Sequence, residues 1–198
     1  MSDREIINNI LKGESHLFEL LVDRYKSMVF KVAMGFVHDT QAANDIVQDV
    51  FVKLWSQLGD FTFEAKLSTW LYRVTVNTSL NVLRKDKFKS MIEDISHLTR
   101  TNDDGSIEIQ IEDSYGETPE DYVRNEELRQ LLKKAIDSLP KKQKIAFVLS
   151  KYRGLSSKDI AEIMEISPGN VDVLIYRAKQ KLQKYILKHS KNFNPNDL

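Results

Sequence analysis

The sequence contains no cysteine, so it offers no disulfide framework, no zinc ribbon and no thiol nucleophile. It also lacks the run of roughly 18 apolar residues that a membrane span needs, and its start, MSDREIINNI, lacks the basic-then-apolar layout of a signal peptide. Its 4 histidines are scattered without the spacing of metal ligands, and no nucleophile–base pair is evident. These absences predict a soluble, cytoplasmic protein without a cofactor, and they argue against a metal-dependent enzyme.

The chain of 198 residues also has no net charge, because 29 basic residues balance 29 acidic ones. The charges are, however, unevenly distributed along the chain. Residues 1–89 carry 12 basic and 11 acidic side chains, residues 90–127 carry 2 and 12, and residues 128–198 carry 15 and 6. The net charges of the three segments are therefore +1, −10 and +9. The last third has the charge of a phosphate-binding module, and the acidic middle is typical of a solvated linker.

Within the basic third, residues 156–184 have the pattern of a helix-turn-helix. Ser156 and Asp159 predict the capped start of a short helix whose apolar face is Ile160, Ala161, Ile163 and Met164. Ser167 and Pro168 predict the start of a second helix with an apolar stripe. The stripe of this second helix is Val171, Leu174, Ile175, Ala178 and Leu182. Its other face carries hydrogen-bonding groups and then cations, as a helix in a major groove requires, although plain packing of two bundle helices stays open from this stretch alone.

The first 58 residues are almost wholly helix-patterned. One helix should end at Gly13, and the pattern then continues to about His38 and Asp39. Thr40 is expected to cap the next helix, whose core-facing stripe is Ile46, Val47, Val50, Phe51, Leu54 and Trp55. The other face of this helix, with Asn44, Asp45, Gln48, Asp49, Val52 and Lys53, is either solvated or a docking surface.

Residues 59–67 should form a loop that carries Phe61 and Phe63. These rings either fold back onto the core or offer stacking surfaces to unpaired bases. A helix should follow from Ser68 to about Lys85, with Leu71, Val74, Leu80 and Leu83 buried. Another side of it carries an aromatic residue, two amides and three cations, namely Trp70, Arg73, Asn77, Asn81, Arg84 and Lys85. This mixture suits single-stranded or distorted DNA, although Trp70 also fits the core.

Residues 90–123 lack helical periodicity and predict a linker, within which residues 106–113 have a strand-like alternation. The second domain should open with a helix from about Pro119 to Ser138. Leu139-Pro140 restarts the helical pattern, and Gly154 ends it before the helix-turn-helix. Four helices then make a compact domain, followed by a frayed tail.

In their order, these stretches resemble the extracytoplasmic-function (ECF) sigma factors of the sigma-70 family, the small type with regions 2 and 4 only. Residues 45–55, DIVQDVFVKLW, are similar to the helix with which that family binds the polymerase clamp. Residues 68–85, STWLYRVTVNTSLNVLRK, are similar to its promoter-melting helix, and residues 139–182 are similar to region 4. The resemblance implies an all-α fold of two small helical domains, a region-2 bundle (1–89) and a region-4 helix-turn-helix (124–190), joined by an acidic linker (90–123) and followed by a tail (191–198).

The resemblance also implies a function without catalysis by this chain. The protein would bind the clamp and flap of core RNA polymerase, recognise the minus-thirty-five element and melt the minus-ten element of promoter DNA. An anti-sigma factor would be a further partner, and the acidic linker would lie in the RNA exit path. The alternative is a stand-alone helix-turn-helix regulator, which would give the helix at residues 45–55 no function.

Residue by residue, the resemblance assigns three sets of contacts. The core-polymerase contacts are Asp45, Gln48, Asp49 and Lys53. The minus-ten contacts are Phe61, Phe63, Lys66, Trp70, Arg73, Asn77, Asn81 and Arg84. The minus-thirty-five contacts are Ser167, Asn170, Asp172, Val173, Tyr176 and Arg177 on the second helix, with Lys151, Arg153, Lys158, Lys179 and Lys181 toward phosphates.

Two positions depart from the pattern that the family often shows. Asp172 is acidic where members often carry a basic or small polar residue, so it is better suited to accept from cytosine than to contact phosphate. Asn81 occupies a position often held by Asp, which leaves the base preference of the melting helix open.

Overall fold

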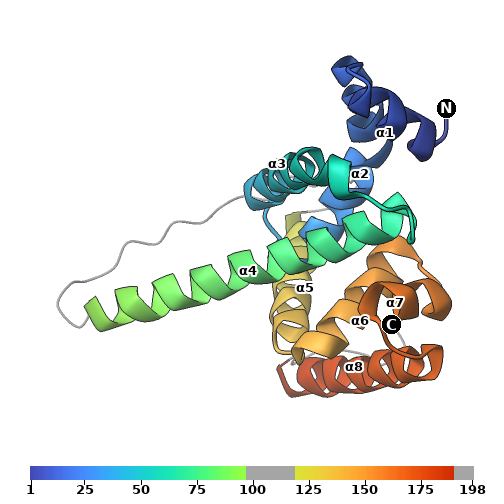
Figure 1. Ribbon diagram of the computed structural model, residues 1–198. Coiled ribbons are helices and arrows are strands. Elements are labelled where there is room, and N and C mark those ends of the chain that lie inside the picture. Colours follow the sequence, from blue (N-terminus) through green and yellow to red (C-terminus); the bar gives the residue numbers. More distant parts are fainter. Residues whose placement is uncertain (97–118, 190–198) are drawn as a thin grey trace. The chain divides into compact units, whose positions relative to one another are not determined.

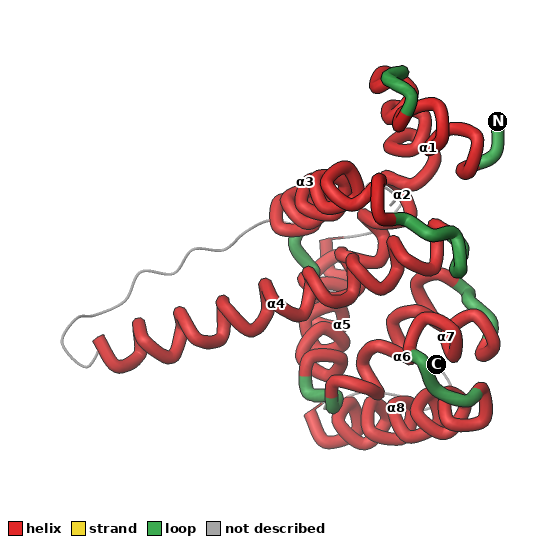
Figure 2. The backbone as a smooth tube through the Cα atoms, in the orientation of Figure 1, coloured by secondary structure: helices red, strands yellow, loops and turns green. Residues whose placement is uncertain are grey.

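A computed structural model of the protein describes residues 1–96 and 119–189, and within these ranges the regular elements are all helices (Figures 1 and 2). The chain divides into two compact units, Met1–Glu108 and Ile109–Leu198. The predicted all-α fold is thus confirmed. Among the described helices, none combines the length and the apolar character that crossing a bilayer would take.

The first unit is built from four α-helices, α1 (Asp3–Leu11), α2 (Phe18–Val37), α3 (Thr40–Gln57) and α4 (Leu67–Ser96). Two short 3-10 turns, η1 (Ser15–Leu17) and η2 (Leu58–Asp60), precede α2 and follow α3. Helix α2 packs against α3 and α4, which also contact each other, while α1 packs on α2 (Figure 1). The amphipathic period predicted this core, whose fully buried side chains include Leu21, Val29, Val32, Phe36, Ile46, Val50, Leu54 and Leu71.

The ends of these helices correct the sequence prediction at two places. Helix α3 is capped by Asp39, not Thr40, because Asp39 has extended backbone (φ −136°) and its carboxylate accepts from the Ala42 N–H at 2.7 Å. Helix α4 continues past Lys85 to Ser96, since no glycine or proline interrupts this stretch. The strand-like residues 106–113 and the tail at 191–198 lie outside the described residues.

The buried side of α4 is more polar than its pattern predicts. Val76 is buried, as are Thr69, Thr75, Thr78 and Ser79, whereas Val74, Leu80 and Leu83 are only half-buried. The Thr75 hydroxyl donates to the Leu71 carbonyl at 2.7 Å, and the Ser79 hydroxyl donates to the Thr75 carbonyl at 2.8 Å. Because these hydroxyls are satisfied inside the helix, they can be buried against α2 and α3 at little cost.

The second unit consists of α5 (Pro119–Asp137), α6 (Lys141–Arg153), α7 (Ser157–Met164) and α8 (Pro168–His189). Helix α8 contacts each of the other three, and α6 contacts α7 (Figure 1). The core includes Val148, Leu149, Ile160, Val171, Ala178 and Ile186. Gly154 ends α6 in the left-handed conformation (φ 62°), as the sequence predicts.

Candidate nucleic-acid interface

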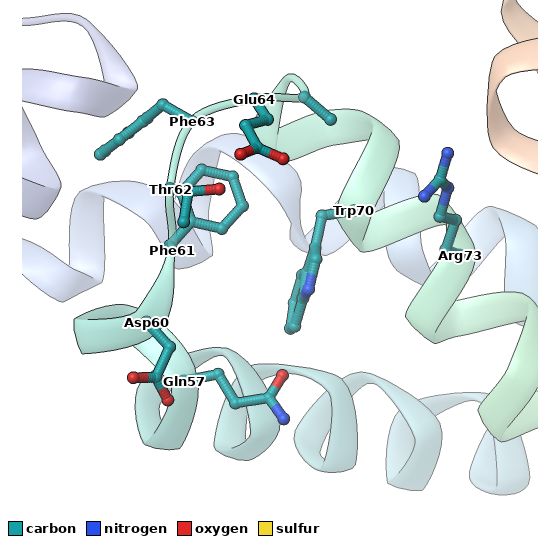
Figure 3. Close-up of a pocket in the computed structure, with 9 residues that line it drawn as sticks. Gln57, Asp60, Phe61, Thr62, Phe63, Glu64, Trp70 and Arg73 are labelled. Atoms are coloured by element: carbon teal, nitrogen blue, oxygen red, sulfur yellow. The ribbon is translucent and has the colours of Figure 1, made fainter.

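A cavity of about 430 Å³ opens in the first unit where α3 ends and α4 begins (Figure 3). Its walls come from the end of α3, from η2, from the loop of residues 61–66 and from the first turns of α4. A volume of this size lies in the range of small-molecule pockets. Its lining residues are Gln57, Asp60, Phe61, Thr62, Phe63, Glu64, Ala65, Trp70 and Arg73.

The two loop phenylalanines point to opposite sides of the loop. The Phe61 ring faces Trp70 across the cavity, whereas the Phe63 ring turns away from Trp70 (Figure 3). The rings of Phe61 and Phe63 meet edge to face, with centroids 4.9 Å apart and planes at 84°. The guanidinium of Arg4, from α1, lies 5.0 Å from the centroid of the Phe63 ring. Phe61, Phe63 and Trp70 are therefore the aromatic side chains that line the cavity, and of the two loop rings only that of Phe61 is turned toward Trp70.

The structure brings together the predicted minus-ten residues Phe61, Phe63, Trp70 and Arg73, because all four line this cavity. Lys66 is exposed in the same loop but does not line the cavity. The remaining predicted residues, Asn77, Asn81 and Arg84, are exposed further along α4. A row of amides and a cation thus follows the cavity along one helix.

Sequence reasoning missed the polar lining of the cavity, which is Gln57, Asp60, Thr62 and Glu64. Figure 3 shows the Glu64 carboxylate directed between the Phe61 ring and Trp70. Carboxylates can accept hydrogen bonds from the amino groups of bases. The signal available in the sequence was proximity alone, since Asp60, Thr62 and Glu64 are next to the two phenylalanines.

The predicted polymerase-facing side of α3 is exposed. Asp45, Gln48, Asp49 and Lys53 all lie at the surface, and among them Val52 is 67% exposed. Lys53 is also bound within the unit, because its Nζ donates to the Thr78 hydroxyl of α4 at 3.0 Å.

The prediction that Trp55 belongs to the buried stripe of α3 is wrong, because this side chain is 48% exposed. Its ring meets Phe18 edge-on, with centroids 5.0 Å apart. Phe51, one turn earlier, is almost fully buried, so the indole lies at the rim of the core, where Phe18 covers only one side of this large ring.

In the second unit, the predicted caps of the helix-turn-helix are confirmed. The Ser156 hydroxyl accepts from the Asp159 N–H at 3.2 Å and begins α7, and the Ser167 hydroxyl accepts from the Asn170 N–H at 3.3 Å and begins α8. Between them, Glu165 turns the chain in the left-handed conformation (φ 55°). Pro168 takes the first position of α8, where no amide hydrogen is needed.

The outer face of α8 is exposed along its length. Tyr176 is 61% and Val173 45% exposed. Most of the other predicted minus-thirty-five residues are exposed as well, namely Lys151, Lys158, Ser167, Asn170, Asp172, Arg177, Lys179 and Lys181, while the side chain of Arg153 lies outside the part that the structure describes. The Gln180 amide donates to the Tyr176 hydroxyl at 2.7 Å. The hydrogen-bonding side chains lie toward the N-terminus of α8 and the lysines follow them, which matches the layout of a recognition helix.

Asp172 has a partner inside the motif. Its carboxylate accepts a hydrogen bond from the hydroxyl of Ser157 on α7 at 2.5 Å. The contact joins the first residue of α7 to the fifth residue of α8, so Asp172 links the two helices of the motif.

Comparison with known proteins identifies the two units. Residues 21–88 match the family "Sigma-70 region 2", and residues 129–182 match "Sigma-70, region 4". The chain is 32% identical over 186 residues to the ECF RNA polymerase sigma-E factor of Haemophilus influenzae, covering 94% of this chain and 96% of that one. The chain is an ECF sigma factor. It is also 30% identical over 182 residues to the RNA polymerase sigma-H factor of Pseudomonas aeruginosa, with 92% of both chains covered.

Solved structures of other proteins share the fold of this sigma factor. CnrH in complex with the cytosolic domain of CnrY matches with a TM-score of 0.64 at 22% identity, covering 95% of this chain and 99% of that one. The sigma factor RpoE of Bartonella quintana, in complex with the anti-sigma factor NepR, matches with a TM-score of 0.59 at 21% identity, covering 87% and 98%. As a sigma factor, the protein directs promoter-specific initiation by RNA polymerase, and a stand-alone regulator is not favoured.

Proposed function

We propose that this sigma factor divides its task among three surfaces. The exposed face of α3 binds the clamp of core RNA polymerase, the cavity with the adjoining side of α4 takes the opened minus-ten strand, and the outer face of α8 reads the minus-thirty-five element. The observation that carries the proposal is the cavity, because the loop aromatic Phe61 and the helix aromatic Trp70 face each other there, at the start of a row of exposed amides and a cation. Stacking surfaces followed by phosphate-binding groups are what a single strand requires.

The α3 surface fits a protein partner. Val52 is an exposed apolar side chain surrounded by Asp45, Gln48 and Asp49, and an apolar anchor with a polar rim is the usual anatomy of an interface. Val52→Asp should therefore weaken binding to core polymerase by roughly tenfold or more. Leu11→Asp is the matched control, because Leu11 is also exposed in the first unit but lies at the end of α1. Equal affinities of the two variants would contradict the α3 assignment.

Melting needs no covalent step by this chain, and the polymerase carries out the catalysis. Extruding a base costs a few kcal/mol in lost stacking and pairing. Stacking on an aromatic side chain returns about 1–3 kcal/mol per base, and cations such as Arg84 contact the backbone. Phe61→Ala should reduce promoter opening by the assembled holoenzyme roughly tenfold, whereas Phe61→Tyr, which keeps the ring, should retain it.

The α8 surface separates base contacts from phosphate contacts. Asn170, in the first turn of the helix, suits a base edge, whereas Lys179 and Lys181 suit phosphates. Asn170→Ala should relax the preference at one base pair. Lys179→Ala should weaken binding of all sequences alike and lower the salt dependence by about one phosphate contact.

An anti-sigma factor is a further proposed partner, and the cytoplasm, where the polymerase acts, is the proposed location. The related folds of CnrH and RpoE were solved with CnrY and NepR bound. The exposed Val52 and Trp55 give such a partner apolar surface to cover on α3. Binding there would compete with core polymerase, which a competition assay with the two proteins measures directly.

One experiment tests the function as a whole. The protein is mixed with core polymerase, the transcripts made from genomic DNA are sequenced, and their start sites are aligned. We expect a shared pair of upstream elements at fixed spacing, and no footprint by the protein alone. Starts without a shared element would refute the proposal, and a footprint without polymerase would favour the stand-alone regulator.

A further inference from the structure

The loop that lines the cavity contains a backbone conformation that its sequence does not favour. Phe63 has φ 58°, in the left-handed region that bulky side chains rarely adopt. This conformation turns the Phe63 ring to the side of the loop opposite the Phe61 ring (Figure 3). A neighbour must therefore hold Phe63 in place, and Arg4 provides the contact, with its guanidinium over the ring face at 5.0 Å.

Arg4 projects from a helix that is itself firmly docked. The Asp3 carboxylate accepts hydrogen bonds from Arg24 and, at 2.6 Å, from the Tyr25 hydroxyl, both on α2. Arg24 also donates to the Met1 carbonyl at 3.0 Å. The inner face of α1 is anchored too, since Ile6, Ile7 and Ile10 are buried.

The first turn of α1 is also held by a capping box. The Ser2 N–H donates to the Glu5 carboxylate at 2.7 Å, and the Glu5 N–H donates to the Ser2 hydroxyl at 3.3 Å. The hydrogen bonds from Ser2, first of all from its backbone N–H, lower the pKa of Glu5. The backbone of Arg4, which lies in this turn, is therefore held in a fixed position.

We infer that α1 is a positioning element for the cavity, with Arg4 as the positioning residue. Arg4 holds the Phe63 ring outside the loop, and the edge-to-face contact of Phe63 with Phe61 keeps the Phe61 ring facing Trp70. The spacing of these two rings then decides which unpaired nucleobase the cavity accepts. The inference rests on the proposed function of the cavity, and α1 lies before the residues 21–88 that match region 2.

A purely structural role for α1 would have a different consequence. It would lower the stability of the first unit without changing the relative acceptance of the four bases. Arg4 is exposed, so its truncation should leave folding nearly unchanged and act on base selectivity. The ratio between the best and the worst base therefore separates the two roles.

The experiment uses the full chain assembled with core polymerase and four promoters that differ only in the base entering the cavity. We expect Arg4→Ala to lower the ratio of transcription between the best and the worst base by about two- to fivefold, the range of a cation–π contact at an exposed site. Arg4→Lys should restore most of the ratio, because an ammonium also binds the ring face. Lys12→Ala, an exposed cation at the end of α1, is the matched control and should leave the ratio at the wild-type value.

A second variant tests whether Arg4 affects base selectivity through the Phe63 ring. Phe63→Leu alone should lower the ratio, and Arg4→Ala should then add nothing to it. Independent effects of the two substitutions, or an unchanged ratio in Arg4→Ala, would overturn the inference. If the wild-type holoenzyme itself accepts all four bases equally, the proposed function of the cavity fails instead, so the two failures are distinguishable.

Discussion

The ion pair between α5 and α6 provides a direct test of how charge is buried in the second unit. The Lys144 Nζ lies 2.6 Å from an Asp137 carboxylate oxygen, and the lysine side chain is 6% exposed while that of the aspartate is 40% exposed. Removing one partner of a fully buried pair costs about 3–5 kcal/mol, and a fully exposed pair contributes about 0–1 kcal/mol. Because the lysine is nearly buried and the aspartate is exposed to water, removing the one or the other should change the unfolding free energy by different amounts.

Asp137→Ala leaves a nearly buried ammonium without this carboxylate, so we expect a loss of about 2 kcal/mol in the unfolding free energy. Lys144→Met removes the charge and fills a similar volume, and it leaves a carboxylate that water already reaches. Its expected cost is below about 1 kcal/mol. The order of the two costs, with the aspartate substitution more harmful, is the prediction.

Urea unfolding can separate the two units, because both tryptophans, Trp55 and Trp70, lie in the first unit. Tryptophan fluorescence reports the first unit, and circular dichroism reports the helices of both. In Asp137→Ala the second transition should move by about 1 M urea or more, while the fluorescence midpoint stays at its wild-type value. A Lys144→Met variant as destabilised as Asp137→Ala would refute the reasoning.

Three further predictions follow from single contacts. Burial, with help from the Asp3 carboxylate, raises the pKa of Tyr25 above its ordinary value of 10.0, so the unfolded chain loses this proton before the folded chain does. Stability should therefore fall as pH rises above about 10, and Tyr25→Phe should flatten that fall in urea unfolding at about pH 8 and pH 11; parallel curves would contradict this. Lys53→Met removes the hydrogen bond to the buried Thr78 hydroxyl and should cost the first unit about 1 kcal/mol, read by tryptophan fluorescence, with no change counting against it. Ser157→Ala frees the Asp172 carboxylate and should shift the preferred base in a minus-thirty-five binding panel, whereas an unchanged preference would remove that role for the contact.

The helices could be predicted because their signals are local. Apolar residues at three- and four-residue spacing mark the buried face of each helix, and the cap serines at 156 and 167 need only the backbone a few residues away. The prediction of Thr40 as the cap of α3 is wrong because a local pattern does not distinguish two adjacent capping residues. Asp39 and Thr40 are both good capping residues, and only the extended backbone at Asp39 decides between them.

The cavity could be predicted only in part. Its aromatic residues were identified, but Gln57, Asp60 and Glu64 carry no periodic signal, and their placement depends on the path of the loop. That path includes a left-handed Phe63, whereas the residues that usually mark this conformation are Gly and Asn. The buried hydroxyls of α4 were missed because threonine and serine count as polar in a hydropathy pattern, although each can satisfy itself within the helix.

The features of this chain that a local pattern misses lie in contacts between residues far apart in sequence. Asp3 reaches α2 across 21 and 22 positions to Arg24 and Tyr25, and Arg4 reaches the loop through Phe63. No local pattern contains such pairs, and each is worth only about 1 kcal/mol, too little to decide the fold but enough for a severalfold preference between bases. The fold thus follows from strong, repeated signals, whereas on our proposal promoter preference would depend on a few weak contacts that hold aromatic rings at fixed angles.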